Sequence, residues 1–314
     1  MNTKRKFRRS WLLFFLWLTF VLPDNNRAEA HSDNVVYRAY DEQTRNSSLW
    51  QSSLAGKRKR ILRYFDGNSS SFDKSGQKML FVSNRRNRME LTEIFLHNFK
   101  TKSTKVLEAK GNTNVSPSFS PHGNTALFAG GYSDSRGPDH DIRIKLKNIN
   151  GKHERILTKG PDDYTPRFSS DGKKIVFMTG ESSTSPDFFT NQRCRQIEIM
   201  DMDGGNRKRL TNTLTDEVSP VFNPNGTQIV FVSFRDGNSE IYAMNVDGTE
   251  VRRLTNNAAN DQQPAVSSDG RFIAWSSNRT GKYQIYVMRL NGTGQRQLTS
   301  HNFDCFEPVW RKSP

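Results

Sequence analysis

The sequence has few of the residues on which several classes of protein depend. Two cysteines in 314 residues are too few for a disulfide framework or a cysteine-rich zinc site. Apolar residues make up only 33% of the chain and the mean hydropathy is −0.78, which excludes a polytopic membrane protein. The aromatic content of 11%, with 21 Phe, is nevertheless too high for a disordered chain. The length therefore leaves two ordinary domains or one large all-β domain.

Short motifs of common enzyme classes are also missing. The sequence contains no G-x-S-x-G elbow, no H-E-x-x-H motif and no G-x-x-x-x-G-K-[ST] loop. Its six histidines show no metal-ligand spacing. The D-x-D-G at 201–204 occupies a hairpin-turn position, which favours a turn over a calcium loop. We therefore predict no catalytic residues, no cofactor and no metal site.

Residues 1–30 have the order of a secretory signal peptide. Basic residues from Lys4 to Arg9 precede an apolar run at 11–22, and Ala28-Glu29-Ala30 follows. The apolar run is too short to span a bilayer as a helix. We predict cleavage before His31 and a periplasmic or secreted protein, with an uncleaved anchor as the alternative. Sec and twin-arginine export both remain open, because Arg8-Arg9 is a weak signal.

The positive charge shrinks when this segment is removed. The formal charge is +15, and the first 30 residues contribute six basic and two acidic side chains, which leaves +11. An exported protein rarely meets nucleic acid, so we expect no nucleic-acid partner. The charge suits an anionic envelope surface or an acidic partner, and a solvated basic surface is the alternative interpretation.

The rest of the chain is an internal repeat. Segments that begin with Pro and reach a turn glycine after about six residues recur, each followed by an apolar strand. The turn glycines are Gly76, Gly123, Gly172, Gly226 and Gly270, and their spacing is that of a four-stranded propeller blade. Each copy continues with a strand such as 240–244, a hairpin turn such as Asp247-Gly248, and a last strand ending in Leu-Thr.

The two ends of the sequence complete one another. Pro308-Val309-Trp310 is an opening strand with nothing after Pro314 to follow it, whereas 35–37, 48–50 and 60–64 resemble a blade without its first strand. We therefore predict an all-β fold over 31–314. It is a six-bladed propeller of four-stranded antiparallel blades, closed when the C-terminal strand joins the N-terminal blade.

The repeat Pro-x-Phe-Ser-x-Asp-Gly, apolar strand, Ile-Tyr-x-Met-x-x-Asp-Gly and Arg-x-Leu-Thr resembles the TolB-type, WD40-like propeller repeat, best over 117–310. TolB proteins are periplasmic members of the Tol–Pal envelope system and carry an amino-terminal α/β domain. We expect that domain to be absent, because about thirty residues separate His31 from the first complete repeat. The resemblance implies a monomeric, non-enzymatic protein-binding or scaffold module in the envelope, with a Pal-like lipoprotein or another protein as partner. The alternative is a propeller enzyme acting on oligosaccharides, of lyase or glycosidase type.

Ligands of propellers bind at the mouth of the central channel, where the loops before each opening Pro converge. Acidic and aromatic residues recur in these loops, and we predict that they bind the partner. The predicted residues are Asp162, Asp163, Tyr164, Asp216, Glu217, Asp261, Gln262, Asp304, Phe306 and Glu307. An acidic, aromatic funnel would suit a cationic peptide segment or a cation. The alternative is that these Asp and Asn residues only cap turns.

Two further features concern the longest insertion, 180–195. It contains Pro186, Phe188 and Phe189, which make it a candidate lid over the channel. It also carries Cys194, which export would allow to pair with Cys305 if the insertion reached across the ring. Whether the two cysteines pair is left open.

Overall fold

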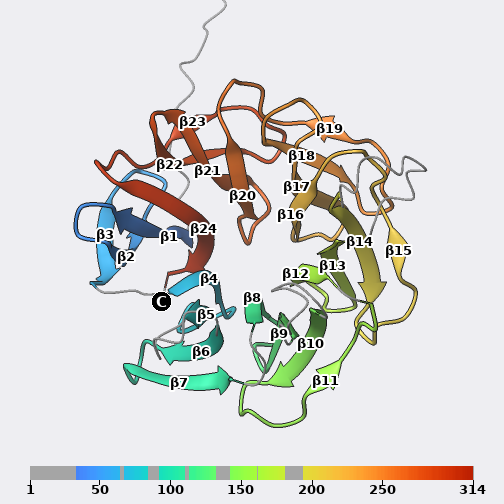
Figure 1. Ribbon diagram of the computed structural model, residues 1–314. Coiled ribbons are helices and arrows are strands. Elements are labelled where there is room, and N and C mark those ends of the chain that lie inside the picture. Colours follow the sequence, from blue (N-terminus) through green and yellow to red (C-terminus); the bar gives the residue numbers. More distant parts are fainter. Residues whose placement is uncertain are drawn as a thin grey trace, which may run out of the picture. The chain divides into compact units, whose positions relative to one another are not determined.

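The computed structural model describes residues 33–63, 67–83, 92–109, 113–131, 142–160, 162–180 and 194–313. These residues form six four-stranded antiparallel sheets, arranged as blades around a central axis (Figure 1). The predicted all-β, six-bladed propeller is confirmed. The predicted signal peptide and residues 181–193 of the candidate lid lie outside the described residues. In the part of the chain that the structure describes, no helix is long and apolar enough to cross a membrane.

The strands follow one another from the centre of each blade to its outer edge. Blade 1 consists of β24 (Asp304–Lys312), β1 (Asp33–Asp41), β2 (Asn46–Ser52) and β3 (Arg58–Leu62). Blade 2 consists of β4 (Gly67–Phe72), β5 (Lys78–Ser83), β6 (Glu93–Asn98) and β7 (Ser103–Glu108). Blade 3 consists of β8 (Thr113–Phe119), β9 (Thr125–Gly131), β10 (Arg143–Asn148) and β11 (Arg155–Ile156).

The other three blades repeat this order. Blade 4 consists of β12 (Asp163–Phe168), β13 (Lys174–Thr179), β14 (Gln196–Asp201) and β15 (Lys208–Arg209). Blade 5 consists of β16 (Glu217–Phe222), β17 (Gln228–Ser233), β18 (Glu240–Asn245) and β19 (Arg252–Arg253). Blade 6 consists of β20 (Asp261–Val266), β21 (Phe272–Thr280), β22 (Lys282–Arg289) and β23 (Arg296–Gln297).

Two faces of the ring are used below. The mouth face is the one at which the six innermost strands β4, β8, β12, β16, β20 and β24 begin. The turn face is the one at which they end, in turns such as Asp171-Gly172, where Gly172 has a φ of +72°. The Asp-Gly hairpins, such as the one at Gly248 with a φ of +94°, also lie on the turn face.

Every innermost strand contains a β-bulge opposite one large aromatic residue. In blade 6, for example, Gln262 pairs with Ser276 and Ala265 with Ala274, so two residues oppose Trp275. The aromatic residues in this position are Tyr37, Phe81, Phe128, Phe177, Phe231 and Trp275, and all six are fully buried. The apolar core therefore lies between the blades, and the bulges turn polar residues towards the axis.

The Leu-Thr that was expected to end each outer strand has another role. The outer strands β15, β19 and β23 pair over only two residues and stop before it. The threonine hydroxyl instead accepts a hydrogen bond from the third strand of its own blade, as in Ile241 N to Thr255 Oγ1 at 2.8 Å. The same contact recurs at Thr158, Thr211 and Thr299. This threonine anchors the loop that leads to the next innermost strand.

The ring closes between the two ends of the described chain, as predicted. Strand β24 pairs with β1 as the innermost strand of blade 1. Arg311 then fastens blade 1 to blade 2, because its Nε donates to the Gly76 carbonyl at 2.7 Å. The guanidinium also lies over the rings of Phe72 and Phe99, at 5.2 and 4.3 Å from their centroids.

Candidate functional site

The recurring carboxylates nearest the opening prolines hold their own blades together. Asp163, Glu217 and Asp261 are completely buried, and each begins an innermost strand. Asp163 receives both Arg207 Nη1 at 3.1 Å and Nη2 at 3.0 Å. The expectation of an open acidic rim is wrong for these three residues, because an arginine already neutralises each carboxylate.

The arginines that pair with Glu217 and Asp261 belong to a second motif that recurs in the sequence. Arg235 follows β17 and donates to Glu217 Oε1 at 3.0 Å, and Arg279, in β21, donates to Asp261 Oδ2 at 2.7 Å. Ser-x-Arg occurs in both places, at 233–235 and 277–279. This second spacing in the sequence was the signal that could have revealed the ion pairs.

Three other acidic residues of these loops accept hydrogen bonds from backbone N–H groups. Asp216 Oδ1 accepts the Arg195 backbone N–H at 2.7 Å, and Asp304 Oδ1 accepts that of Tyr283, also at 2.7 Å. Asp162 is buried with a φ of +65°, and its carbonyl accepts the Gly180 N–H at 2.8 Å. The capping interpretation therefore accounts for the contacts of these acidic side chains and of the Asp162 backbone.

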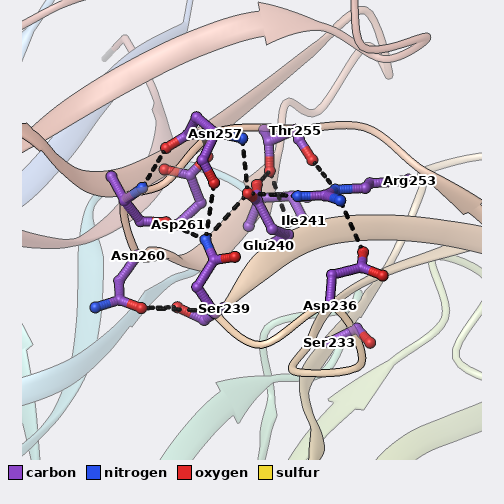
Figure 2. Close-up of polar contacts among 12 residues, drawn as sticks. Ser233, Asp236, Ser239, Glu240, Ile241, Arg253, Thr255, Asn257, Asn260 and Asp261 are labelled. Carbon is purple, nitrogen blue, oxygen red and sulfur yellow. Dashed lines mark hydrogen bonds and ion pairs between the residues drawn. The ribbon is translucent and has the colours of Figure 1, made fainter.

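Figure 2 shows how far this polar framework extends in blade 5 and into the start of blade 6. Glu240 is completely buried and accepts hydrogen bonds from the Asn257 backbone and from Arg253, both at 2.8 Å, and from the Thr255 hydroxyl. Asn257 Nδ2 in turn donates a hydrogen bond to Asp261 Oδ2 at 2.9 Å. The charges of this framework are therefore paired, and hydrogen bonds hold the loop before β20 in place.

Burial controls the ionisation of Asp163. Its removal from water outweighs the attraction of Arg207 and raises the pKa of this carboxyl from 3.8 to about 6. The folded pKa lies above the unfolded one, so the charged form costs stability at neutral pH, and this cost is relieved as the pH falls through about 6.

Unfolding at different pH values tests this assignment. We expect the wild type to gain about 2 kcal/mol of unfolding free energy relative to Asp163→Asn when the pH falls from about 7 to about 4. Urea titrations of both proteins at a series of pH values measure the difference. A difference that stays constant over this range would show that Asp163 does not titrate in it.

An aromatic cluster on the mouth face lies between blades 6 and 1. The rings of Tyr283 and Phe306 are 4.9 Å apart, and the Arg38 guanidinium lies 5.3 Å from the Phe306 centroid. All three side chains are partly exposed. Phe306 was predicted from the sequence, whereas Tyr283 and Arg38 were missed because both lie outside the loops before the prolines.

The remaining predicted residues are spread around the mouth. Gln262 donates to Ser239 Oγ at 3.3 Å, and the Tyr164 hydroxyl lies 3.5 Å from Asp162 Oδ1. Glu307 lies in the channel itself, where its Oε2 accepts the Ser69 N–H at 2.9 Å and lies 3.7 Å from Arg38 Nε. Asp304, Phe306 and Glu307 thus lie together on β24. The other predicted residues lie in or beside the innermost strands of blades 4, 5 and 6.

The channel is lined by residues of all six innermost strands and has a volume of about 510 Å³. The bulge residue of each strand has a positive φ and lines this space. These six residues are Ser69, Ser116, Thr165, Ser219, Gln263 and Glu307. Arg167 also lines the channel, and its side chain crosses to blade 3, where Nη1 donates to the Ser116 carbonyl at 3.1 Å.

Two sequence expectations concern cysteine and metal. Cys194 and Cys305 are both buried free thiols and are not paired. Among the described residues no three His, Cys, Asp or Glu side chains are grouped so that they could hold a metal ion.

Comparisons with known proteins agree with the repeat. Residues 187–313 match the family model of the TolB beta propeller domain, PD40. A protein TolB homolog of Chlorobium luteolum is 27% identical over 182 residues, which are 58% of this chain and 36% of that protein. The chain therefore aligns with only about a third of the length of this relative.

Solved structures show the same fold. TolB from Acinetobacter baumannii has a TM-score of 0.73 at 22% identity, covering 89% of this chain and 67% of that one. A putative TolB from Agrobacterium tumefaciens has a TM-score of 0.68 at 18% identity, covering 90% and 99%. An oligogalacturonate lyase in complex with manganese is also similar, with a TM-score of 0.54 at 16% identity over 85% and 73% of the two chains. At these identities the likeness extends to the fold alone.

Proposed function

We propose that this chain, a propeller similar to TolB, is a non-enzymatic module of the cell envelope that docks a protein partner on its mouth face. The basic, apolar and Ala-x-Ala order of residues 1–30 supports export to the periplasm or beyond. An envelope protein such as a Pal-like lipoprotein is the partner we propose, in keeping with the Tol-Pal system protein TolB of Ruegeria among its relatives.

The observation that carries this proposal is the apolar and aromatic surface around a rigid mouth. Phe306 and Tyr283 are partly exposed beside Arg38, and Leu214, in the loop before β16, is 79% exposed. Aromatic and arginine side chains are the residues that most often dominate the energy of protein interfaces. The buried ion pairs below them fix the loops in advance, which lowers the entropy lost on docking.

Capture from an envelope extract of the source organism tests the proposal. The purified chain without residues 1–30 serves as bait, and we expect the double variant Leu214→Ser, Phe306→Ser to bind the partner at least about tenfold more weakly. Met202→Ser is the matched control, because Met202 is 47% exposed but lies in a hairpin on the turn face. Equal capture by the double variant, with an unchanged thermal transition, would rule out docking on the mouth face.

A further inference from the structure

The channel departs from its own repeat at two positions, and both departures introduce a charge. The bulge position carries Ser, Thr or Gln in five blades and Glu307 in blade 1. The position two residues after the bulge carries Ser71, Ser118, Val221, Ala265 and Val309 in five blades. In blade 4 it carries Arg167. The other five blades pack with small or apolar residues at this position. Packing of the ring therefore does not require an arginine there.

Arg167 differs from the other arginines described around the mouth because no carboxylate of the described residues neutralises it. Its Nη1 donates to two backbone carbonyls, Ser116 O at 3.1 Å and Pro166 O at 3.0 Å. Among the described residues no Asp or Glu forms an ion pair with it, and Nε and Nη2 have no protein partner. Burial lowers the pKa of Arg167 to about 10. Arg167 is only partly exposed, and a cation held largely away from water without a counter-charge is costly, because such charges in proteins are normally paired.

A second polar group of the channel also lacks a partner. Thr165 Oγ1, two residues before Arg167 on the same strand, is buried and forms no hydrogen bond in the described structure. Both side chains line the cavity of about 510 Å³, together with the bulge residues Ser116 and Ser219 of the neighbouring strands. The unpartnered Thr165 hydroxyl and the charge of Arg167 therefore lie on the same strand of the channel wall.

The other charge of the channel does not neutralise this group. Glu307 belongs to blade 1, three blades away from Arg167 and thus across the ring (Figure 1). Its Oε2 is held by the Ser69 N–H at 2.9 Å and lies 3.7 Å from Arg38 Nε. Its presence nevertheless disfavours a ligand with two or more negative charges, because like charges repel strongly in a confined space.

We propose that the channel binds a carboxylate group through Arg167, with Thr165 as a further hydrogen-bond donor. The planar fork of Nε and Nη2 fits the two oxygens of a carboxylate. Pro220, Pro264 and Val266 line the same space and suit the organic part of such a ligand. The carboxylate comes from a free small acid or from the C-terminus of a peptide, and the site does not depend on the mouth-face partner.

Isothermal titration calorimetry on the chain without residues 1–30 tests this site. The probes are acetate, succinate, sulfate, triglycine and triglycine with an amidated C-terminus. We expect the monocarboxylates to bind, and the dianions succinate and sulfate to bind at least about tenfold more weakly than the best of them. If the best ligand is acetate, the source is a free acid. If triglycine binds best and its amide does not bind, the source is a peptide terminus.

Two variants connect the binding to the named residues. Arg167→Gln is expected to weaken the best carboxylate by at least about tenfold, and Thr165→Val by about fivefold. Thr165→Val preserves shape and removes a hydroxyl that bonds nothing, so its folding should be unaffected. Arg155→Gln is the matched control, because Arg155 also donates to a carbonyl of the neighbouring blade, Asp203 O at 2.7 Å, but on the exposed exterior.

The proposal is overturned if no carboxylate probe binds the wild type, if sulfate binds as tightly, or if folded Thr165→Val and Arg167→Gln bind like the wild type. These results are separate from the docking of a protein partner. A chain that binds no carboxylate in solution but still captures its partner refutes the channel site alone. The Leu214→Ser, Phe306→Ser variant is expected to lose capture of the partner and still to bind carboxylates like the wild type.

Discussion

A chain that stops after Phe303 is expected to lose cooperative folding altogether. Residues 304–312 form β24, the innermost strand of blade 1, although the other three strands of that blade lie at the opposite end of the chain. Without β24, the completely buried Val35, Val36 and Tyr37 lose their cover, and Arg311 no longer joins blade 1 to blade 2. We expect the loss to exceed the total stability of a typical domain, about 5–15 kcal/mol.

Thermal unfolding followed by circular dichroism measures this effect. The matched control is a chain that ends at Lys312, because Ser313 contributes only an exposed hydrogen bond to Asn34 at 2.7 Å. We expect the control to unfold within about 0.5 kcal/mol of the full chain. If the chain that ends at Phe303 retained a sharp transition near the original temperature, β24 would not be what closes the ring.

The second large effect is expected at Asp261. Asp261→Lys places a positive charge in a completely buried position next to the Arg279 guanidinium and removes the acceptor of Asn257. Breaking a buried ion pair costs about 3–5 kcal/mol, and reversing one charge costs more. We therefore expect the variant to be unfolded or to melt well below the wild type, which urea unfolding would measure.

Gln262→Lys provides the comparison for Asp261→Lys. Gln262 is the next residue of β20, is partly exposed, and forms one long hydrogen bond to Ser239 at 3.3 Å. The same new charge at this position should change the unfolding free energy by less than about 1 kcal/mol. If both variants were equally stable, the acid at 261 would lie on an open rim, as the sequence alone suggested.

The fold was predictable because several copies of the repeat carry the same sequence pattern. Five turn glycines with nearly constant spacing identify the blades, and Pro308-Val309-Trp310 supplies the strand that the N-terminal blade lacks. All five glycines have the positive φ that their turns require, between +69° and +73°. Such turns can be recognised in a single sequence because a backbone with positive φ strongly favours glycine.

The site was less predictable, because its chemistry depends on contacts between distant residues. Asp163 and Asp304 are both acids shortly before an opening proline, yet Asp163 is buried against Arg207 and Asp304 caps the loop at Tyr283. The Ser-x-Arg spacing could have revealed Arg235 and Arg279 as partners of acids, but Arg207, the partner of Asp163, lies outside that pattern. The departures from the repeat were visible: Arg167 and Glu307 break the pattern, and these two charges line the channel.

Photo-cross-linking in the source organism tests the docking face most directly. A photoreactive amino acid is placed at Leu214 on the mouth face, and in a second protein at Met202 on the turn face. Both side chains are exposed apolar residues, at 79% and 47%, so neither replacement should disturb the fold. We predict one discrete cross-linked envelope protein from Leu214 and none from Met202. The same protein cross-linked from Met202 alone would place the binding face on the opposite side of the ring and contradict the proposed function.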